Sequence, residues 1–203
     1  MTNSLHNLFP VPVMVNESWR EPTIAEREYF TRIRSEERVE NIGNSYTKEN
    51  HILDAPEMIS LKEDLTSAIN SYFQEIWKPI YDVEVYITIS WINFTEMGQF
   101  HHNHVHTNSA ISGVYYIDTD DSDKIHFTNP QPTWLTMRVE SREWNDWNCG
   151  ERWISTPKNS LVLFPSKLRH NVSATTNPNT RISLSFNTFF KGKLSDDLDE
   201  IVL

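Results

Sequence analysis

The spacing of the apolar residues changes at about residue 80 and predicts helices before that point and strands after it. In the first part, apolar residues recur every three or four positions, which is the period of an amphipathic helix. One helix is expected over about 24–40. A second is expected from near Asp54, a candidate N-cap with Pro56 in the first turn, to about Trp77. The apolar stripe of this second helix consists of Met58, Leu61, Leu65, Ile69, Tyr72, Phe73 and Ile76.

After Pro79 apolar and polar residues alternate, which is the period of a β-strand. Turn-forming segments such as DTDDSD, NPQP, TPKNS and TNPNT separate the alternating stretches. We also expect an extended edge segment at 8–15 and a loop at 41–53. The expected strands lie at 83–94, 110–118, 124–128, 135–140, 151–155, 160–164 and 181–190.

Helices followed by about seven strands make an α+β fold that is mainly β. The expected main body is a β-sandwich or jelly roll, with the N-terminal helices packed on one sheet. A chain of 203 residues suits one domain with a full hydrophobic core. We therefore expect a single domain over 1–203, divided into a helical part at about 1–80, a jelly-roll core at about 81–190 and an acidic tail at 191–203.

Charge and composition narrow the range of partners. The net charge is -10, so the surface repels phosphates and nucleic acid is not expected as a partner, whereas a basic peptide or a small polar substrate stays open. Cys149 is the only cysteine, which excludes an intrachain disulfide framework and favours a cytoplasmic setting. No stretch approaches the roughly 20 apolar residues of a membrane span, and the start lacks the pattern of a secretory signal. No membrane partner is expected, and the oligomeric state stays open.

Four of the eight histidines lie in the segment GQFHHNHVHTN, between two expected strands. On a strand, residues two apart point to the same side, so His104 and His106 can present both imidazoles to one metal ion, and His102 can share that face. The best candidate for a third ligand is His170, which follows the apolar segment LVLF. The alternative is a histidine-rich surface loop or an adventitious metal binder. Three isolated histidines are assigned to the surface or the core, namely His6, His51 and His126.

Five motifs follow one another between about residues 85 and 190. They are Gly98, the pair His104 and His106, the strand Ser112 to Tyr116, the segment Phe164 to His170, and the segment Arg181 to Asn187. The segment HVHTNSAISGVYYID resembles the iron-binding segment of 2-oxoglutarate/Fe(II) oxygenases of the prolyl hydroxylase type. The ordered set resembles a family of such oxygenases found in bacteria and phages. This resemblance implies a double-stranded β-helix core.

The resemblance also implies Fe(II), the cosubstrate 2-oxoglutarate and the oxidant O2. Carried over by position, His104 and His170 are iron ligands, while His106 stands where the wider superfamily usually has aspartate. A facial set of two histidines and one carboxylate leaves open positions for cosubstrate and O2. Because the similar family itself uses His-x-His, we expect three histidine ligands. The alternative is two histidines and a water molecule, with His106 outside the ligand set.

A cosubstrate pocket follows from the same resemblance. Arg181 takes the place of the basic residue that binds the distal carboxylate of 2-oxoglutarate, which a guanidinium can hold through two parallel hydrogen bonds. Ser183 faces the same way, Tyr116 matches a tyrosine that reaches this carboxylate, and Asn93 is a candidate pocket residue together with Trp91. The competing interpretations are a solvent-exposed strand-end arginine, a core tyrosine and a solvated edge asparagine.

The implied activity is hydroxylation of an unidentified substrate, with a prolyl or other residue of a protein or peptide as the first candidate. The segment 129–155 contains Trp134, Trp144, Trp147 and Trp153 and either shapes the substrate mouth or packs in the ordinary way. Two other functions stay open. One is a cupin-like dioxygenase that uses three histidines without 2-oxoglutarate, and the other is a non-catalytic jelly-roll module that binds a metal or a ligand.

Overall fold

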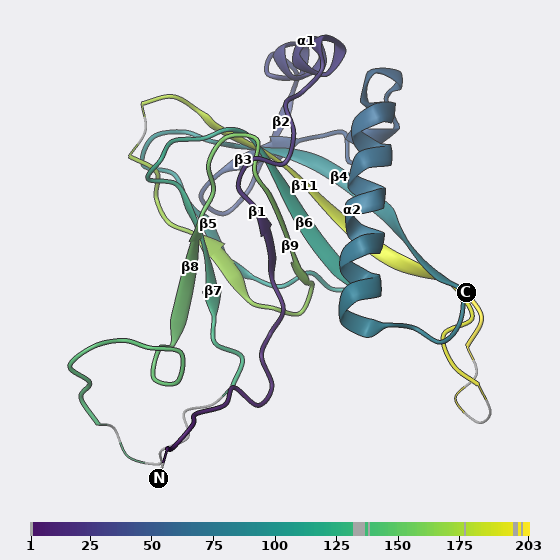
Figure 1. The fold of residues 1–203 in the computed structure, drawn as a ribbon. Coiled ribbons are helices and arrows are strands. Elements are labelled where there is room, and N and C mark those ends of the chain that lie inside the picture. The colour runs from purple at the N-terminus through teal and green to yellow at the C-terminus, as the bar shows by residue number, and fades with distance from the viewer. Residues whose placement is uncertain (1, 132–136, 138, 177, 197–198, 200) are drawn as a thin grey trace.

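Two antiparallel sheets face each other in the computed structural model, which describes residues 2–131, 137, 139–176, 178–196, 199 and 201–203 (Figure 1). The large sheet has the order β1 (Met14–Asn16), β9 (Leu161–Pro165), β6 (Ile111–Asp118), β11 (Arg181–Gly192), β4 (Val83–Thr95), β3 (Ser45–Thr47) and β2 (Arg38–Glu40). The small sheet has the order β5 (His101–His104), β10 (His170–Val172), β7 (Lys124–Thr128) and β8 (Glu151–Ser155). This arrangement is a jelly roll, as the sequence predicted.

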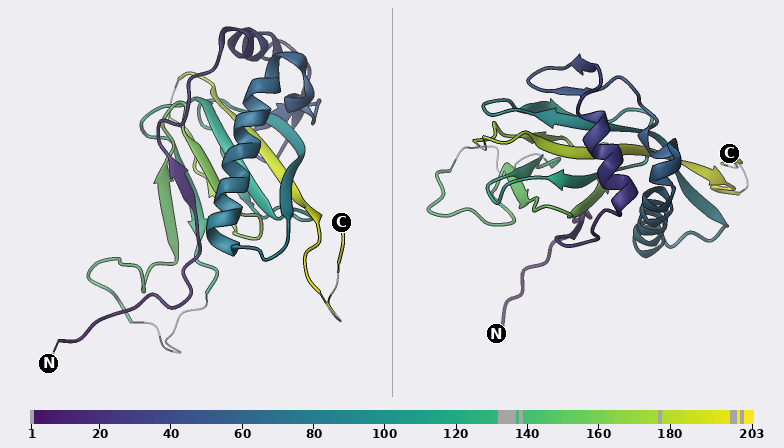
Figure 2. Two further views of the ribbon diagram at one scale, coloured as in Figure 1. Left: turned by 45° about the vertical axis from the view of Figure 1, so that its right-hand side comes forward. Right: turned by 90° about the horizontal axis from the view of Figure 1, so that it is seen from above.

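The helices α1 (Ile24–Ile33) and α2 (Ile59–Trp77) lie outside the two sheets, with α2 against the outer face of the large sheet (Figure 2). The apolar stripe expected on α2 is buried at Leu61, Leu65 and Ile69, but Ile76 is 41% exposed. Thr23 begins α1 with a reciprocal capping box to Glu26, which satisfies free backbone N–H groups at the helix start. The predicted placement of the N-terminal helices on one sheet is confirmed.

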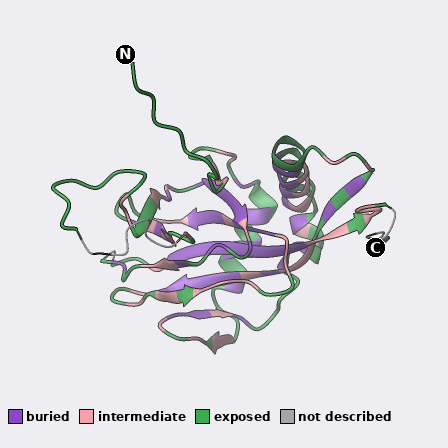
Figure 3. Cartoon of the chain, turned by 90° about the horizontal axis from the view of Figure 1, so that it is seen from below, coloured by how far each residue is buried: buried purple, intermediate pink, exposed green. Residues whose placement is uncertain are grey.

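Alternation along β11 separates an apolar face from a polar face, although both are buried along the centre of the sheet (Figure 3). Ile182, Leu184 and Phe186 join the core beneath α2. The intervening residues face the small sheet and are polar, namely Arg181, Ser183, Ser185 and Asn187. A buried polar wall is costly unless its groups are hydrogen-bonded or bind something, so this face marks the place to look for a site.

A second apolar cluster joins the two sheets. Tyr116 and Phe164 of the large sheet pack in it with Ile125 and Phe127 of the small sheet and with Leu168. The polar residues of β11 therefore lie beside an apolar half of the same interior. This apolar cluster fixes the position of the small sheet against the large sheet, beside the polar residues of β11.

The boundaries of the N-terminal elements differ from the prediction. The helix expected to reach about residue 40 ends at Ile33, its last buried residue, because the charged residues that follow give it nothing to bury. Residues 38–40 instead form β2, which pairs with β3 inside the expected loop at 41–53. Both short strands extend the edge of the sheet beyond β4.

Asp54 is not the N-cap of α2. The residue before a proline is biased away from helical angles, and Ala55 before Pro56 is extended at ψ 141°. The chain therefore makes two 3-10 turns, Ile52–Asp54 and Pro56–Met58, before α2 begins at Ile59. Asp54 instead forms an ion pair with Lys62 at 2.6 Å.

Most of the strands expected after Pro79 are found with similar bounds, but the structure adds two short strands that the sequence did not predict, β5 and β10. The strands expected at 124–128 and 151–155 are found with those bounds, and β1 is an edge strand within the extended segment 8–15 and the next residue. The strand expected at 135–140 falls largely outside the described residues. Within the described part of the chain, none of the helices has the length and apolar character needed to cross a bilayer.

Candidate metal centre and cosubstrate pocket

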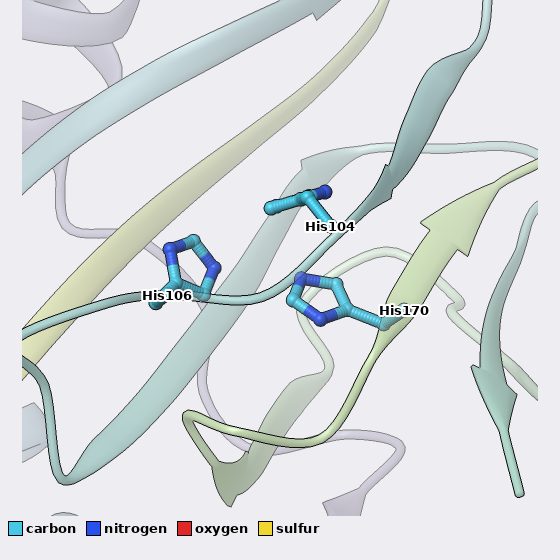
Figure 4. Close-up of side chains that lie close together, drawn as sticks. All are labelled: His104, His106 and His170. Carbon is cyan, nitrogen blue, oxygen red and sulfur yellow. The ribbon is translucent and has the colours of Figure 1, made fainter. Parts of the chain in front are cut away.

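Three histidines from the two neighbouring strands β5 and β10 converge between the sheets (Figure 4). His104 ends β5 and His170 begins β10, and the two are direct partners in the antiparallel register. His106 follows two residues after β5, so its ring can reach the same point. The ring centroids lie 4.3 Å apart for His104 and His170, 5.0 Å for His104 and His106, and 5.1 Å for His106 and His170. One ligand nitrogen from each ring lies within 4.8 Å of the other two.

Backbone hydrogen bonds fix the orientation of two of these rings. Nδ1 of His104 lies 2.8 Å from the carbonyl oxygen of His102, and Nδ1 of His170 lies 3.0 Å from that of Leu168. A carbonyl oxygen only accepts, so Nδ1 carries the proton in each ring and donates it. The lone pair is then on Nε2, which is the tautomer of a metal ligand whose other nitrogen is held by a backbone acceptor.

Burial keeps the three imidazoles neutral. Together with the neighbouring histidines, it lowers the pKa of His170 to about 3 and that of His106 to about 4. The pKa of His104 is also lowered by burial. His170 packs edge-on against Phe164, with ring centroids 4.7 Å apart. Three neutral nitrogen donors in a partly apolar interior suit a divalent transition metal, so the donor set fits iron.

Two further histidines surround this centre. His101 stacks on His104 with ring centroids 4.5 Å apart, and its Nε2 lies 3.5 Å from the side-chain amide of Asn41. The ring of His102 lies 5.0 Å from that of His104, but His102 is outside the group whose donor atoms converge. Sequence reasoning gave no role to His101. The one signal for it was its place in the histidine run.

Arg181 is buried inside the jelly roll, with 3% of its side chain exposed. Nη2 donates to Oγ1 of Thr95 at 3.3 Å, whereas Nε and Nη1 have no hydrogen-bond partner among the described residues. Burial lowers its pKa, and the nearby Asp123 raises it. A buried guanidinium with unpaired N–H groups is costly, so this site is suited to receive a carboxylate. The solvent-exposed interpretation of Arg181 is wrong.

The other three residues expected in the pocket form a row across the large sheet. Ser183 of β11 is paired with Asn93 of β4 on one side and with Tyr116 of β6 on the other. All three are buried, with exposures of 6%, 4% and 2%. Burial raises the pKa of Tyr116, so its hydroxyl stays protonated and can donate a hydrogen bond.

Asn93 is not a solvated edge residue. Its amide donates to Oγ of Ser185 at 2.9 Å and accepts from the indole N–H of Trp91 at 3.2 Å. The Trp91 ring in turn lies 5.9 Å from that of His106. These contacts connect Asn93 to the metal centre through Trp91 and to β11 through Ser185.

The described residues between β7 and β8 are exposed or half-buried, and Trp153 in β8 is exposed. Trp144, Trp147 and Trp153 are 75%, 45% and 54% exposed, so ordinary core packing does not describe them, and Trp134 lies outside the described residues. Trp147 helps to line a cavity of about 630 Å³. Its other walls come from the N-terminal segment and from β7 and β8. Leu168 and Phe127 separate this cavity from His170.

The family model described as "Putative 2OG-Fe(II) oxygenase" matches residues 89–187, which contain the three histidines and Arg181. The chain belongs to the 2-oxoglutarate/Fe(II) oxygenases. As a member of this family it is an enzyme that uses Fe(II), 2-oxoglutarate and O2, which confirms the expected cofactors. Of the three functional hypotheses, the family match supports the oxygenase over the dioxygenase that lacks 2-oxoglutarate and over the non-catalytic module. No curated protein matches the chain in sequence.

Solved structures of this enzyme class have the same fold. A prolyl-4-hydroxylase from Pseudomonas putida is similar at a TM-score of 0.57 and 12% identity, over 87% of this chain and 92% of the other. A Trichoplax adhaerens prolyl hydroxylase, solved with a hypoxia inducible factor peptide fragment, gives 0.58 and 12% over 87% and 83%. The epimerase SnoN from nogalamycin biosynthesis, solved with Fe3+, alpha ketoglutarate and nogalamycin RO, gives 0.62 and 12% over 88% and 79%.

Proposed function

We propose that this oxygenase holds Fe(II) on His104, His106 and His170 and binds 2-oxoglutarate against Arg181, Tyr116 and Ser183. The observation that carries the proposal is the position of three neutral, converging imidazoles in the same interior as a buried arginine, two of whose nitrogens lack a hydrogen-bond partner among the described residues. The first group suits a divalent metal and the second suits a carboxylate. One cosubstrate that chelates iron at one end and carries a carboxylate at the other satisfies both.

The residues of the chain bind the metal ion, orient the cosubstrate and exclude water. Backbone acceptors hold His104 and His170 with Nε2 free for the metal. Arg181 is the candidate partner for the distal carboxylate, with the hydroxyls of Tyr116 and Ser183 as further donors, and Asn93 braces the row. Iron held by His104, His106 and His170 would supply O2 activation coupled to the oxidative decarboxylation of 2-oxoglutarate to succinate and CO2. The apolar cluster around Phe164 and Phe127 keeps water away from the histidine side of the pocket.

We further propose that the substrate is a side chain of a protein or peptide, with a prolyl residue as the first candidate. Two of the similar structures are prolyl hydroxylases, and one of these was solved with a peptide. A net charge of -10 favours a basic peptide, and the exposed tryptophans of 129–155 offer a surface for it. We propose that residues 1–203 act as one functional domain, because β11 carries both the helix-covered core and the polar face of the site. The single cysteine, Cys149, favours a cytoplasmic setting.

The first test is anaerobic addition of Fe(II) and then 2-oxoglutarate to metal-free protein. We expect the weak visible charge-transfer band of the iron chelate, and we expect Arg181→Ala to weaken it. Iron that binds without producing a band on addition of 2-oxoglutarate would contradict the proposed roles.

The substrate test follows in air. Proline-containing basic peptides should stimulate succinate release and gain the mass of one oxygen atom. Small molecules are tested in the same assay as the alternative class of substrate, because the similar structure of SnoN was solved with the small molecule nogalamycin RO. Stimulation by members of that set alone would overturn the peptide proposal and leave the metal and cosubstrate roles intact.

A further inference from the structure

A second buried charge, Asp123, lies beside Arg181. It sits in the turn between β6 and β7, and only 3% of its side chain is exposed. Its Oδ1 lies 3.6 Å from Nη1 of Arg181, which is an ion pair but is longer than a hydrogen bond. Two opposite charges this well buried attract each other strongly, because little water screens them. Nothing in the sequence pattern had singled out Asp123.

The turn holds this carboxylate in place independently of the arginine. Oδ2 of Asp123 accepts the backbone N–H of Asp120 at 2.9 Å. The backbone of Asp123 is also bound on both sides, by N–H donation to the Asp120 carbonyl at 3.0 Å and by acceptance from the Thr156 N–H at 3.1 Å. Arg181 is held separately through Thr95. Each partner therefore stays in position when the other is changed.

The charges of the site explain why a carboxylate stands here. Three neutral histidines contribute no negative charge to an Fe(II) centre, whereas an aspartate ligand contributes one. With Fe(II) at +2, 2-oxoglutarate at -2, Arg181 at +1 and Asp123 at -1, the buried groups sum to zero. Without Asp123 they sum to +1. An uncompensated buried charge is unfavourable, so Asp123 balances the occupied site as well as the empty one.

We propose that Asp123 is a specificity-determining counter-ion, which competes with incoming carboxylates for Arg181 and so restricts the pocket to ligands that also chelate the metal. The inference rests on the proposed cosubstrate role of Arg181. An anion that gains only the arginine contact meets repulsion from Asp123. The cosubstrate overcomes this repulsion because its other end binds iron. Asp123 therefore lowers the affinity for every carboxylate ligand at Arg181, and only a ligand that also chelates the metal keeps enough affinity to bind.

The test compares Asp123→Asn with wild type by isothermal titration calorimetry under anaerobic conditions. The ligands are 2-oxoglutarate and glutarate, which lacks the chelating oxo group, and each is titrated into Fe(II)-loaded and metal-free protein. Asparagine is isosteric and still accepts the Asp120 N–H, so the change removes charge and little else. We expect both ligands to bind Asp123→Asn about tenfold more tightly or better, with measurable glutarate binding even without metal. Asp121→Asn is the matched control, because Asp121 is an exposed carboxylate in the same turn, and it should bind as wild type does.

A double variant tests whether Asp123 acts through Arg181. In an Arg181→Gln background the gain in affinity from Asp123→Asn should be smaller than in the wild-type background, because the competition for the guanidinium is gone and only direct repulsion of the ligand remains, whereas a general effect on folding would give the same gain in both. Circular dichroism checks the fold, and Asp123→Ser, whose hydroxyl also accepts the Asp120 N–H, replaces Asp123→Asn if the latter does not fold.

The outcomes separate this inference from the proposed function. Equal or weaker binding by folded Asp123→Asn overturns the counter-ion role, while 2-oxoglutarate binding by wild type would still support the proposed function. Failure of Fe(II)-loaded wild type to bind 2-oxoglutarate overturns the proposed function itself. A gain in affinity that is equally large with and without Arg181 overturns the inference alone.

Discussion

His104 and His170 are direct cross-strand partners, and their rings lie 4.3 Å apart although 65 positions separate them in the sequence. The antiparallel pairing of β5 with β10 sets this distance, so the metal centre depends on backbone register as much as on the side chains. A shift of one residue in either strand would turn one ring away from the other.

Loss of His170 should therefore remove metal binding. His170→Ala is expected to lower the affinity for Fe(II) at least about 100-fold, because only two imidazole ligands remain and His104 loses its cross-strand partner in the site. Anaerobic titration with a competing chelator measures this affinity. His51→Ala, at an exposed position outside the histidine group, is the matched control and should leave it unchanged. Tight Fe(II) binding by folded His170→Ala would remove His170 from the ligand set.

His106 distinguishes the two ligand sets that the sequence left open. If three histidines hold the metal, His106→Ala should weaken Fe(II) binding by about 10-fold or more, and His106→Asp should restore much of it as an anionic ligand. If two histidines and a water molecule hold it, neither change should matter much. X-ray absorption of the Fe(II)-loaded protein counts the imidazole ligands independently, and a count of two would overturn our proposal for His106.

Arg181 should control cosubstrate affinity without controlling metal affinity. Arg181→Gln removes the charge that pairs with the distal carboxylate, and we expect 2-oxoglutarate to bind about 100-fold more weakly, a loss of ~3 kcal/mol. Fe(II) affinity should change little. Arg169→Gln, at an exposed arginine next to His170, is the control for loss of one positive charge near the centre. A matching loss of 2-oxoglutarate affinity in that control would indicate a general electrostatic effect instead of a specific contact.

The strands could be read from the sequence because their alternation reports burial on two faces. β7 and β8 were predicted with their observed bounds, and the neighbours Tyr115 and Tyr116 of β6 lie in the two different apolar clusters, as alternation along a strand requires. The short strands β2 and β3 could not be read in this way, because three residues carry too little periodicity and their pairing with β4 is a tertiary contact.

The site was only partly predictable for a similar reason. His104, His106, His170 and Arg181 stand in motifs, and the structure brings the three histidines together. Asp123 stands in a turn segment, DTDDSD, whose composition already explains its acidic residues. Its burial beside Arg181 depends on how this turn folds over the end of β11, which the local sequence does not encode.

Gly113 is a point where the packing of the large sheet allows no side chain. A Cβ atom there would lie 2.1 Å from the Phe186 ring and 2.6 Å from Leu163. Gly113→Ala should therefore lower the free energy of unfolding by about 1–3 kcal/mol or more through overpacking, which denaturant unfolding measures. Gly150→Ala is the control, because no atom lies within 4 Å of its added Cβ. Equal stabilities of the two variants would show that the sheet can shift to make room.

The pKa shifts of the histidines predict how the stability of the metal-free protein depends on pH. Burial lowers the pKa of His106 to about 4 and that of His170 to about 3, so the folded state does not take up protons that the unfolded chain binds near pH 6.5. The unfolded state then holds more protons, and the free energy of unfolding falls as the pH decreases from 6.5 towards 4. Each of the two groups contributes at most about 1.4 kcal/mol per pH unit. Urea unfolding between pH 7 and pH 5 measures the slope, which His106→Asn should reduce and which His6→Asn, in the exposed N-terminal segment, should leave unchanged. A slope that is the same in wild type and His106→Asn would mean that His106 is not held neutral by the fold.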